Sequence, residues 1–206
     1  MRIERLVVLV SGGGTNLQSL INACEDGRIN ARISGVISSK EGVYALERAK
    51  NAGIPTAVVK ACDYEDQRQR DAAVIEAVER FGGQAVVLAG YMSILGKDVV
   101  SRYKIINIHP ALIPSFCGKG FYGQRVHKAV LDYGAKVSGA TTHFVDEGTD
   151  TGPVIMQKCV PVLDNDTPET LAARVLGAEH EILVESVSLL CDGRLRIEGR
   201  RVFIID

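Results

Sequence analysis

The sequence predicts an α/β protein in which helices cover both faces of a mostly parallel sheet. Short apolar runs, such as LVVLV at residues 6–10, have the continuous hydrophobicity of strands buried on both sides. Amphipathic stretches alternate with these runs over the first hundred residues, and parallel strands need such crossover helices. Two later strands follow one another without a helix between them, which favours antiparallel pairing. We therefore expect a doubly wound, Rossmann-like sheet with an antiparallel C-terminal portion.

The elements of the first half follow from these two patterns. Leu17, Leu20, Ile21 and Cys24 recur at i, i+3, i+4 and i+7, the spacing of one buried helix face. Glycine and proline residues after the second and third helices mark where those helices end. We expect helices at 16–24, 44–51 and 70–81, and strands at 6–10, 33–37, 56–59 and 85–89.

Strands dominate the second half until one long helix. A buried strand is expected at 105–108, followed by strands at 138–145 and 154–162 that a glycine-rich loop joins. A helix at 168–191 and a terminal strand at 201–205 complete the pattern. No repeat or linker interrupts it. We therefore expect one domain over residues 1–206, with an N-terminal half of about 1–100 and a C-terminal half of about 101–206.

Composition and charge exclude several classes of function. The chain carries 24 Lys and Arg against 25 Asp and Glu, whereas a non-specific nucleic-acid binder needs a surplus of positive charge. No apolar run approaches the roughly 20 residues that span a bilayer, and the short N-terminal run lacks a signal-peptide cleavage site. Five scattered cysteines without a CxxC pair disfavour disulfides and structural zinc. We expect a reduced, cytoplasmic protein that binds neither nucleic acid nor membranes.

A glycine loop, SGGGTN at residues 11–16, joins the first strand to the first helix. A dinucleotide site would need a glycine in place of Leu17 and an acidic residue after the second strand, which instead ends Ser-Ser-Lys. The Gly-Lys-Ser/Thr of a Walker loop is also missing. The loop therefore predicts a phosphate monoester bound by the amides of Gly14, Thr15 and Asn16, with a tight structural turn as the alternative.

Two polar side chains close the otherwise apolar strand at 105–108. Asn107 and His109 lie two residues apart, so both emerge on one face of the sheet, and strand ends are where ligands bind in doubly wound folds. An amide donor beside an imidazole suits a carbonyl whose oxygen becomes negative in the transition state. The alternative is a structural pair that bonds to the loop backbone.

Asp150 lies between two glycines in the loop that joins the next two strands. A carboxylate close to His109 would orient the imidazole and raise its pKa, which favours proton donation. One alternative is an acid that only stabilises a turn. Another is a metal site formed by His109, His143 and Asp150. Cys117 has no base beside it in the sequence, which disfavours a nucleophilic role.

Taken together, these residues resemble the phosphoribosylglycinamide formyltransferase family, the folate-dependent formyl transferases of purine synthesis. The resemblance covers essentially the whole chain. It runs through SGGGTN, VVLAGYMSIL, NIHPALIP, HFVDEGTDTGPV and the ARV…AEH stretch of the last helix. NIHP with a downstream DxGP is shared by all folate formyl-transfer relatives, whereas the glycine loop is more particular to this branch.

The resemblance implies transfer of a formyl group from 10-formyltetrahydrofolate, as co-substrate, to the amine of glycinamide ribonucleotide without a metal. It implies a phosphate-binding N-terminal half and a folate-binding, catalytic C-terminal half. It also implies small-molecule partners. A monomer and a weak homodimer are equally compatible with the sequence. The implied residues are Asn107, His109 and Asp150 for catalysis; Gly14, Thr15, Asn16 and Glu179 for the ribonucleotide; and Met92, Ser93, Ile94, Leu95, Asp146, Glu147, Gly148 and Thr149 for the folate.

Several positions depart from the family pattern. Ser93 stands where better-known members often have arginine, and Leu176 stands where they have a polar contact to the phosphate. The loop at 115–124 is a glycine-rich variant in which Lys119 offers a positive charge. The family's arginine near the start of the third helix corresponds to either Gln67 or Arg68. The related hydrolase and the tRNA-directed transferase carry further domains for which we expect no room in 206 residues.

Overall fold

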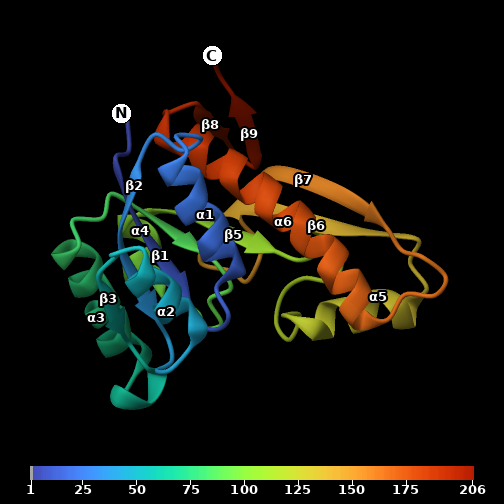
Figure 1. Cartoon of the computed structure of the whole chain (residues 1–206), viewed down its shortest axis with the longest axis horizontal. Coiled ribbons are helices and arrows are strands. Elements are labelled where there is room, and N and C mark those ends of the chain that lie inside the picture. Colours follow the sequence, from blue (N-terminus) through green and yellow to red (C-terminus); the bar gives the residue numbers. More distant parts are fainter. Residues whose placement is uncertain (1) are drawn as a thin grey trace.

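The computed structural model describes residues 2–206 and contains one nine-stranded sheet (Figure 1). Five strands lie parallel, and β6 is antiparallel to both of its neighbours, β5 and β7. The last strand joins β7 in parallel at a single residue pair, and the final two strands are antiparallel. In sheet order the strands are β3 (Thr56–Val58), β2 (Arg32–Ser38), β1 (Arg5–Val10), β4 (Ala85–Leu88), β5 (Lys104–His109), β6 (Val137–Phe144), β7 (Val154–Pro161), β9 (Arg201–Ile204) and β8 (Leu195–Glu198). The predicted fold class is confirmed.

Helices cover both faces of the sheet. They are α1 (Thr15–Glu25), α2 (Tyr44–Asn51), α3 (Gln67–Arg80), α4 (Lys97–Arg102), α5 (Gln124–Tyr133) and α6 (Pro168–Cys191), with a 3₁₀ turn, η1, at Ala61–Asp63. Leu6 and Val8 of β1 pack into the core under α1, α2, α5 and α6, whereas Val7 and Leu9 pack under α3 and α4. The two-residue alternation of a strand therefore supplies both cores, as a doubly wound sheet requires. Figure 1 shows α1 and α6 in contact over one face.

Besides the short η1 turn, two helices and one strand were not predicted from the sequence. Helix α4 has only six residues, and its N-cap residue, Gly96, offers no side-chain cap. Helix α5 begins directly after the glycine-rich loop, and a histidine, His127, lies on its buried face between Val126 and Val130. Strand β8 is mostly exposed, so its sequence lacks the apolar signal of a buried strand. The predicted helices and the other strands are confirmed, with boundaries that differ by a few residues.

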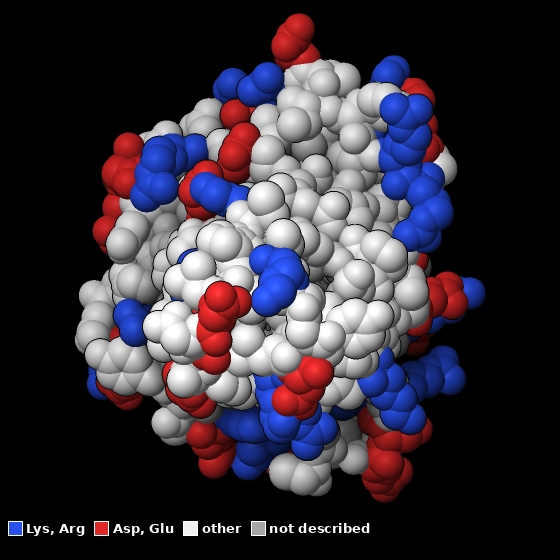
Figure 2. Space-filling view, turned by 90° about the vertical axis from the view of Figure 1, so that its right-hand side faces the viewer, with Lys and Arg blue, Asp and Glu red and all other residues white. Residues whose placement is uncertain are grey.

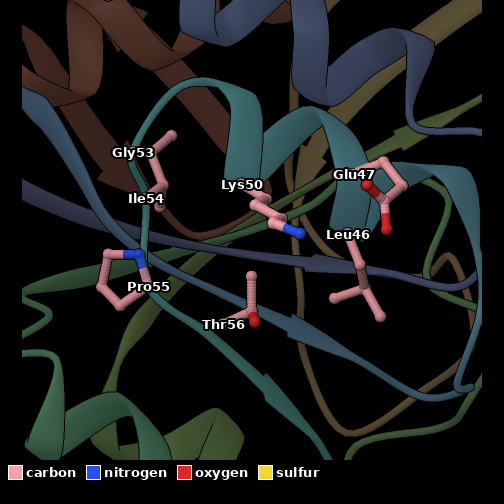
Figure 3. Close-up of a pocket in the computed structure, with 7 residues that line it drawn as sticks. All are labelled: Leu46, Glu47, Lys50, Gly53, Ile54, Pro55 and Thr56. Carbon is pink, nitrogen blue, oxygen red and sulfur yellow. The ribbon is translucent and has the colours of Figure 1, made fainter.

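The surface carries charges of both signs. Figure 2 shows the end of the molecule near α5, where basic and acidic side chains are interspersed and the middle is mostly uncharged. A surface cavity of about 470 Å³ lies between α2 and β3, at the opposite end of the sheet from β8 (Figure 3). None of the predicted site residues lines this cavity. Within residues 2–206, no helix is both long and apolar enough to cross a membrane.

Candidate active site

The end of β5 brings Asn107 and His109 to one face of the sheet. Ile106 and Ile108 alternate with them and lie in the core under α1 and α6, so the two polar side chains point the other way. In β6, His143 lies directly across from Asn107 and therefore shares its face. Asn107 Nδ2 is 3.1 Å from His143 Nε2.

The hydrogen bonds of His143 show which of its two ring nitrogens carries the hydrogen. Nδ1 is 2.8 Å from the carbonyl oxygen of Phe144, which can only accept, so Nδ1 carries the hydrogen. Nε2 then accepts a hydrogen bond from the Asn107 amide. This contact leaves the second hydrogen of the Asn107 NH₂ group available to another acceptor. His143 therefore fixes which end of the Asn107 amide is the donor.

Asp150 lies between the two histidines. One oxygen, Oδ2, is 3.5 Å from His109 Nδ1, and the other, Oδ1, is 3.7 Å from His143 Nε2. Oδ2 also accepts a 2.9 Å hydrogen bond from the amide of Gly118. Within residues 2–206, Asp150 and Phe116 are the non-glycine residues with a left-handed backbone, at φ of 58° and 49°. Such conformations persist where the surrounding structure holds them, and they concentrate at functional sites.

His109 is buried, with 4% of its surface exposed. Its Nε2 is 2.9 Å from the carbonyl oxygen of Phe116. Burial lowers the pKa of His109 below its ordinary value, and this effect outweighs the charge of Asp150 and the bond to Phe116, both of which raise it. Our expectation of a raised pKa was therefore wrong, because it considered the carboxylate and neglected desolvation. In the unliganded chain, His109 is a neutral imidazole at neutral pH whose Nε2–H donates to Phe116.

For the pKa of Asp150, the neighbouring groups outweigh the effect of burial. Burial alone raises the pKa of this carboxyl. The imidazoles of His143 and His109, which attract the carboxylate when they are protonated, and the Gly118 amide together bring the pKa below its ordinary value. Asp150 is therefore a carboxylate at neutral pH, and it faces the imidazole edge of His109 that does not bond to Phe116. This arrangement suits a proton acceptor.

The loop at residues 115–123 covers these side chains. Besides the contacts of Phe116 and Gly118, the Phe116 ring packs edge-on against Phe121 and Tyr133, at centroid distances of 6.4 and 5.9 Å. The Cys117 thiol donates to the carbonyl oxygen of Pro114. Burial and, after it, the charge of Asp150 raise the pKa of Cys117, so it stays a thiol. This agrees with our interpretation that Cys117 is not a nucleophile.

The glycine loop lies at the end of β1. Gly14 caps α1 with a left-handed backbone, at φ 72°, and a Cβ at this position would lie 2.7 Å from Cβ of Ala45. No side chain caps α1, so the amides of its first turn point outward without an intrahelical partner. Arg48 of α2 donates to the carbonyl oxygen of Gly13 at 2.9 Å and adds a positive charge beside the loop. This geometry suits an anion such as a phosphate.

The long helix α6 brings Glu179 to the same loop. Asn16 Nδ2 donates to Glu179 Oε2 at 2.6 Å, across 163 residues of sequence. Burial raises the pKa of Glu179, and the Asn16 bond opposes that shift. A cavity of about 260 Å³ lies beside this contact and is lined by Thr15, Arg48 and His180, among others. Burial lowers the pKa of His180.

The two segments expected to bind folate border one another. Met92 and Ile94 are 48% and 66% exposed, whereas Leu95 is buried in the same core cluster as Val145, which precedes the second segment. Lys97 forms a 3.4 Å ion pair with Glu147 across the gap between them. Apolar side chains and loop backbone therefore lie together at this edge, as a planar heteroaromatic ligand requires.

A family model described as Formyl transferase matches residues 4–187, a span that contains the glycine loop, both polar strand ends and Glu179. The chain belongs to the formyl transferase family. It is 41% identical over 198 residues to "Phosphoribosylglycinamide formyltransferase, chloroplastic" of Arabidopsis thaliana, which covers 95% of this chain and 68% of that protein. It is 38% identical over 201 residues to "Phosphoribosylglycinamide formyltransferase" of Escherichia coli (strain K12), which covers 97% and 92%. The crystal structure of glycinamide ribonucleotide transformylase 1 from Symbiobacterium toebii superimposes with a TM-score of 0.94 at 42% identity, covering 99% of this chain and 95% of that one.

Some features of the site in this formyl transferase were not predicted from the sequence. His143 was considered only as a metal ligand, and its contact with Asn107 depends on the register between β5 and β6, which no local motif reveals. Arg48 was not considered at all. Gln67, Arg68 and Lys119 are all exposed, and Gln67 bonds to the carbonyl oxygen of Ile94 in the expected folate segment.

The same family member brings His109, His143 and Asp150 together, as the alternative metal hypothesis required. Each ring nitrogen of the two histidines, however, already faces another protein group. His109 faces Phe116 and Asp150, and His143 faces Phe144 and Asn107. Across the part of the chain that the structure describes, no group of three or more His, Cys, Asp or Glu side chains has the arrangement of a metal site.

Proposed function

We propose that this chain transfers the formyl group of 10-formyltetrahydrofolate to the amine of glycinamide ribonucleotide, a step of purine synthesis. One observation carries the proposal: Asn107, His109 and Asp150 converge at the end of β5 with donors and an acceptor in a fixed arrangement. The family membership and the phosphate-suited loop at the end of β1 support the same reaction.

The residues divide into two binding regions. The backbone amides of Gly14, Thr15 and Asn16 hold the phosphate of the ribonucleotide, and Glu179 accepts hydrogen bonds from its ribose hydroxyls. The segments 92–95 and 146–149 hold the pterin ring of the folate by apolar contact and backbone hydrogen bonds. The reacting amine then lies between these regions, beside the end of β5.

The chemistry requires a donor for the formyl oxygen and an acceptor for the amine proton. The amine nitrogen forms a bond to the formyl carbon, and the carbonyl electron pair moves onto the oxygen. Asn107 Nδ2–H and His109 Nε2–H donate to that oxygen, for which the formyl group replaces the Phe116 carbonyl as the partner of His109. Asp150 takes up the amine proton through a water molecule. The bond from the formyl carbon to the folate nitrogen then breaks, and that nitrogen receives the proton.

The neutral state of His109 fits this role. An uncharged imidazole that donates from Nε2 polarises a carbonyl without first being protonated, as neutral histidines do in other enzymes. Asp150 is held ionised by its neighbours and is therefore ready to accept a proton. No step needs a metal ion, so we expect turnover to be unchanged by a chelator.

The test is an assay of the purified chain with 10-formyltetrahydrofolate, with and without glycinamide ribonucleotide, followed by identification of the products. We expect a formylated ribonucleotide and tetrahydrofolate in equal amounts. Release of formate at the same rate without the amine would instead indicate the related hydrolase. Absence of both reactions would contradict an enzymatic function on folate.

We further propose that residues 1–206 act as one domain and as a monomer or weak homodimer. The sheet runs without interruption from β3 to β8, and the site draws residues from both halves of the chain. Sedimentation at increasing concentration tests the oligomeric state. A stable assembly larger than a dimer at micromolar concentration would contradict this proposal.

A further inference from the structure

Helix α3 carries two buried charged side chains that the proposed chemistry does not use. Arg70 and Asp71 lie one turn inside the N-terminus of the helix and are 8% and 2% exposed. Charged side chains are rarely buried unless protein groups satisfy them. Their partners therefore indicate what the pair is for.

Those partners belong to the backbone of the segment expected to bind folate. The guanidinium of Arg70 and the side-chain amide of Gln67 both donate to the carbonyl oxygen of Ile94, the latter at 2.8 Å. Asp71 Oδ2 accepts a 2.9 Å hydrogen bond from the amide of Gly96 and also bonds to Gln67. Three side chains from the first turns of α3 thus hold two backbone groups that flank Leu95.

The fit around Asp71 leaves no room for a side chain at residue 96. A Cβ on Gly96 would lie 2.1 Å from Asp71 Oδ2. On the other side of the segment, the amide of Met92 donates to Ser11 Oγ at 2.8 Å. The backbone is therefore held at both ends, although the side chains of Met92 and Ile94 are largely exposed.

Holding the Ile94 carbonyl has a consequence for the next amide. In a trans peptide the C=O of one residue and the N–H of the next point in opposite directions. Because the Ile94 oxygen points at α3, the Leu95 N–H points away from α3. Within residues 2–206 this N–H has no protein acceptor. It is therefore a donor held at a fixed angle.

We propose that Gln67, Arg70 and Asp71 are positioning residues that orient the Ile94–Leu95 peptide so that the Leu95 N–H meets a hydrogen-bond acceptor on the folate ring. This inference rests on the proposed function. It assigns folate affinity in part to side chains on α3 that do not touch the folate. Binding of the ribonucleotide at the glycine loop does not depend on them.

The main test is Arg70→Met, which removes the guanidinium donors and keeps a long apolar side chain. We expect KM for 10-formyltetrahydrofolate to rise about tenfold, while kcat and KM for glycinamide ribonucleotide stay within about twofold of the original values. Arg70→Lys retains one donor and should recover most of the loss. Arg80→Met, at the exposed end of the same helix, is the matched control and should leave all three constants unchanged.

Gly96→Ala tests the same contact from the segment itself, because the new methyl group displaces the Asp71 carboxylate. It should weaken binding of tetrahydrofolate, measured by calorimetry, by a similar factor and speed hydrogen exchange of the residue 96 amide. This variant also serves if Arg70→Met does not fold.

Three results would overturn the inference. The first is unchanged folate binding in Arg70→Met and Gly96→Ala. The second is an equal loss of affinity for both substrates. The third is a fall in kcat and melting temperature that Arg70→Lys does not reverse, which would indicate general destabilisation. Failure of the original chain itself to bind tetrahydrofolate would instead contradict the proposed function, and the inference with it.

Discussion

The ends of β1 and β5 offer two different kinds of binding surface. At β1, the groups that suit an anion are backbone amides exposed by a left-handed glycine at the start of α1. At β5, the active groups are side chains that come from β5, β6 and the loop before β7. The first site is contiguous in sequence, apart from Glu179 and Arg48. The second needs three segments to be in register.

The two sites should therefore respond differently to substitutions. Any substitution other than proline leaves the backbone amide in place, so the β1 site is sensitive mainly to changes that disturb the loop backbone. The β5 site loses a defined chemical group with each substitution, and its members depend on one another through hydrogen bonds. We therefore expect binding defects at the first site and rate defects at the second.

Asp150→Asn should have the largest effect. The amide keeps the shape of the side chain, but it cannot accept a proton. Loss of a positioned general base typically lowers the rate about 10²–10⁴-fold. We expect kcat to fall within that range and the dissociation constants of both substrates to change little. Asp164→Asn, at an exposed position, is the control. Rates near the original value would remove Asp150 from the mechanism.

His143→Leu should have the next largest effect. The substitution removes the acceptor that fixes the Asn107 amide, so the oxyanion donor loses its orientation. Removing such a donor outright lowers kcat about 10²–10³-fold, and we expect a loss at the lower end of that range. A double variant with Asn107→Ala distinguishes orientation from an independent role. The two losses should not add, because both act through one donor. Full additivity would show that His143 acts by another route.

The contrast between the two sites also explains how much the sequence revealed. The glycine loop, the Asn107–His109 strand end and the parallel half of the sheet are patterns within a few residues, so local rules were sufficient to predict them. The role of His143 in orienting Asn107 was not predictable, because it depends on the pairing of β5 with β6. The direction of the His109 pKa depended on burial under the loop at 115–123, which the sequence does not encode locally. Helix α4 is too short, and strand β8 too exposed, to give a periodic apolar pattern in the sequence.

Gly14→Leu tests the backbone site. Its Cβ would clash with Ala45, and its backbone conformation is strained for any side chain, so the first turn of α1 must shift. We expect the dissociation constant for glycinamide ribonucleotide to rise at least tenfold, while that for tetrahydrofolate stays within twofold. Gly27→Leu carries the same left-handed strain with no neighbour near its Cβ and should leave both constants unchanged. Loss of folate affinity with intact ribonucleotide binding, measured by calorimetry, would mean that the two regions are assigned the wrong way round.

The smallest expected effect is a pH dependence of stability that originates at the β5 site. The folded-state pKa of His109 lies below that of an unfolded histidine, so the unfolded chain binds the proton more tightly between those two values. The free energy of unfolding should therefore fall as the pH drops below about 6.5, by at most about 1.4 kcal/mol per pH unit from this residue. The pKa of Asp150 is also lowered in the folded chain, but for an acid this shift adds stability. That stabilisation is present above about pH 4 and is lost only below that pH. Urea unfolding of the original chain and of His109→Gln between pH 5 and 7 measures the difference. The variant should have the shallower slope, and equal slopes would mean that the imidazole is not held neutral by burial.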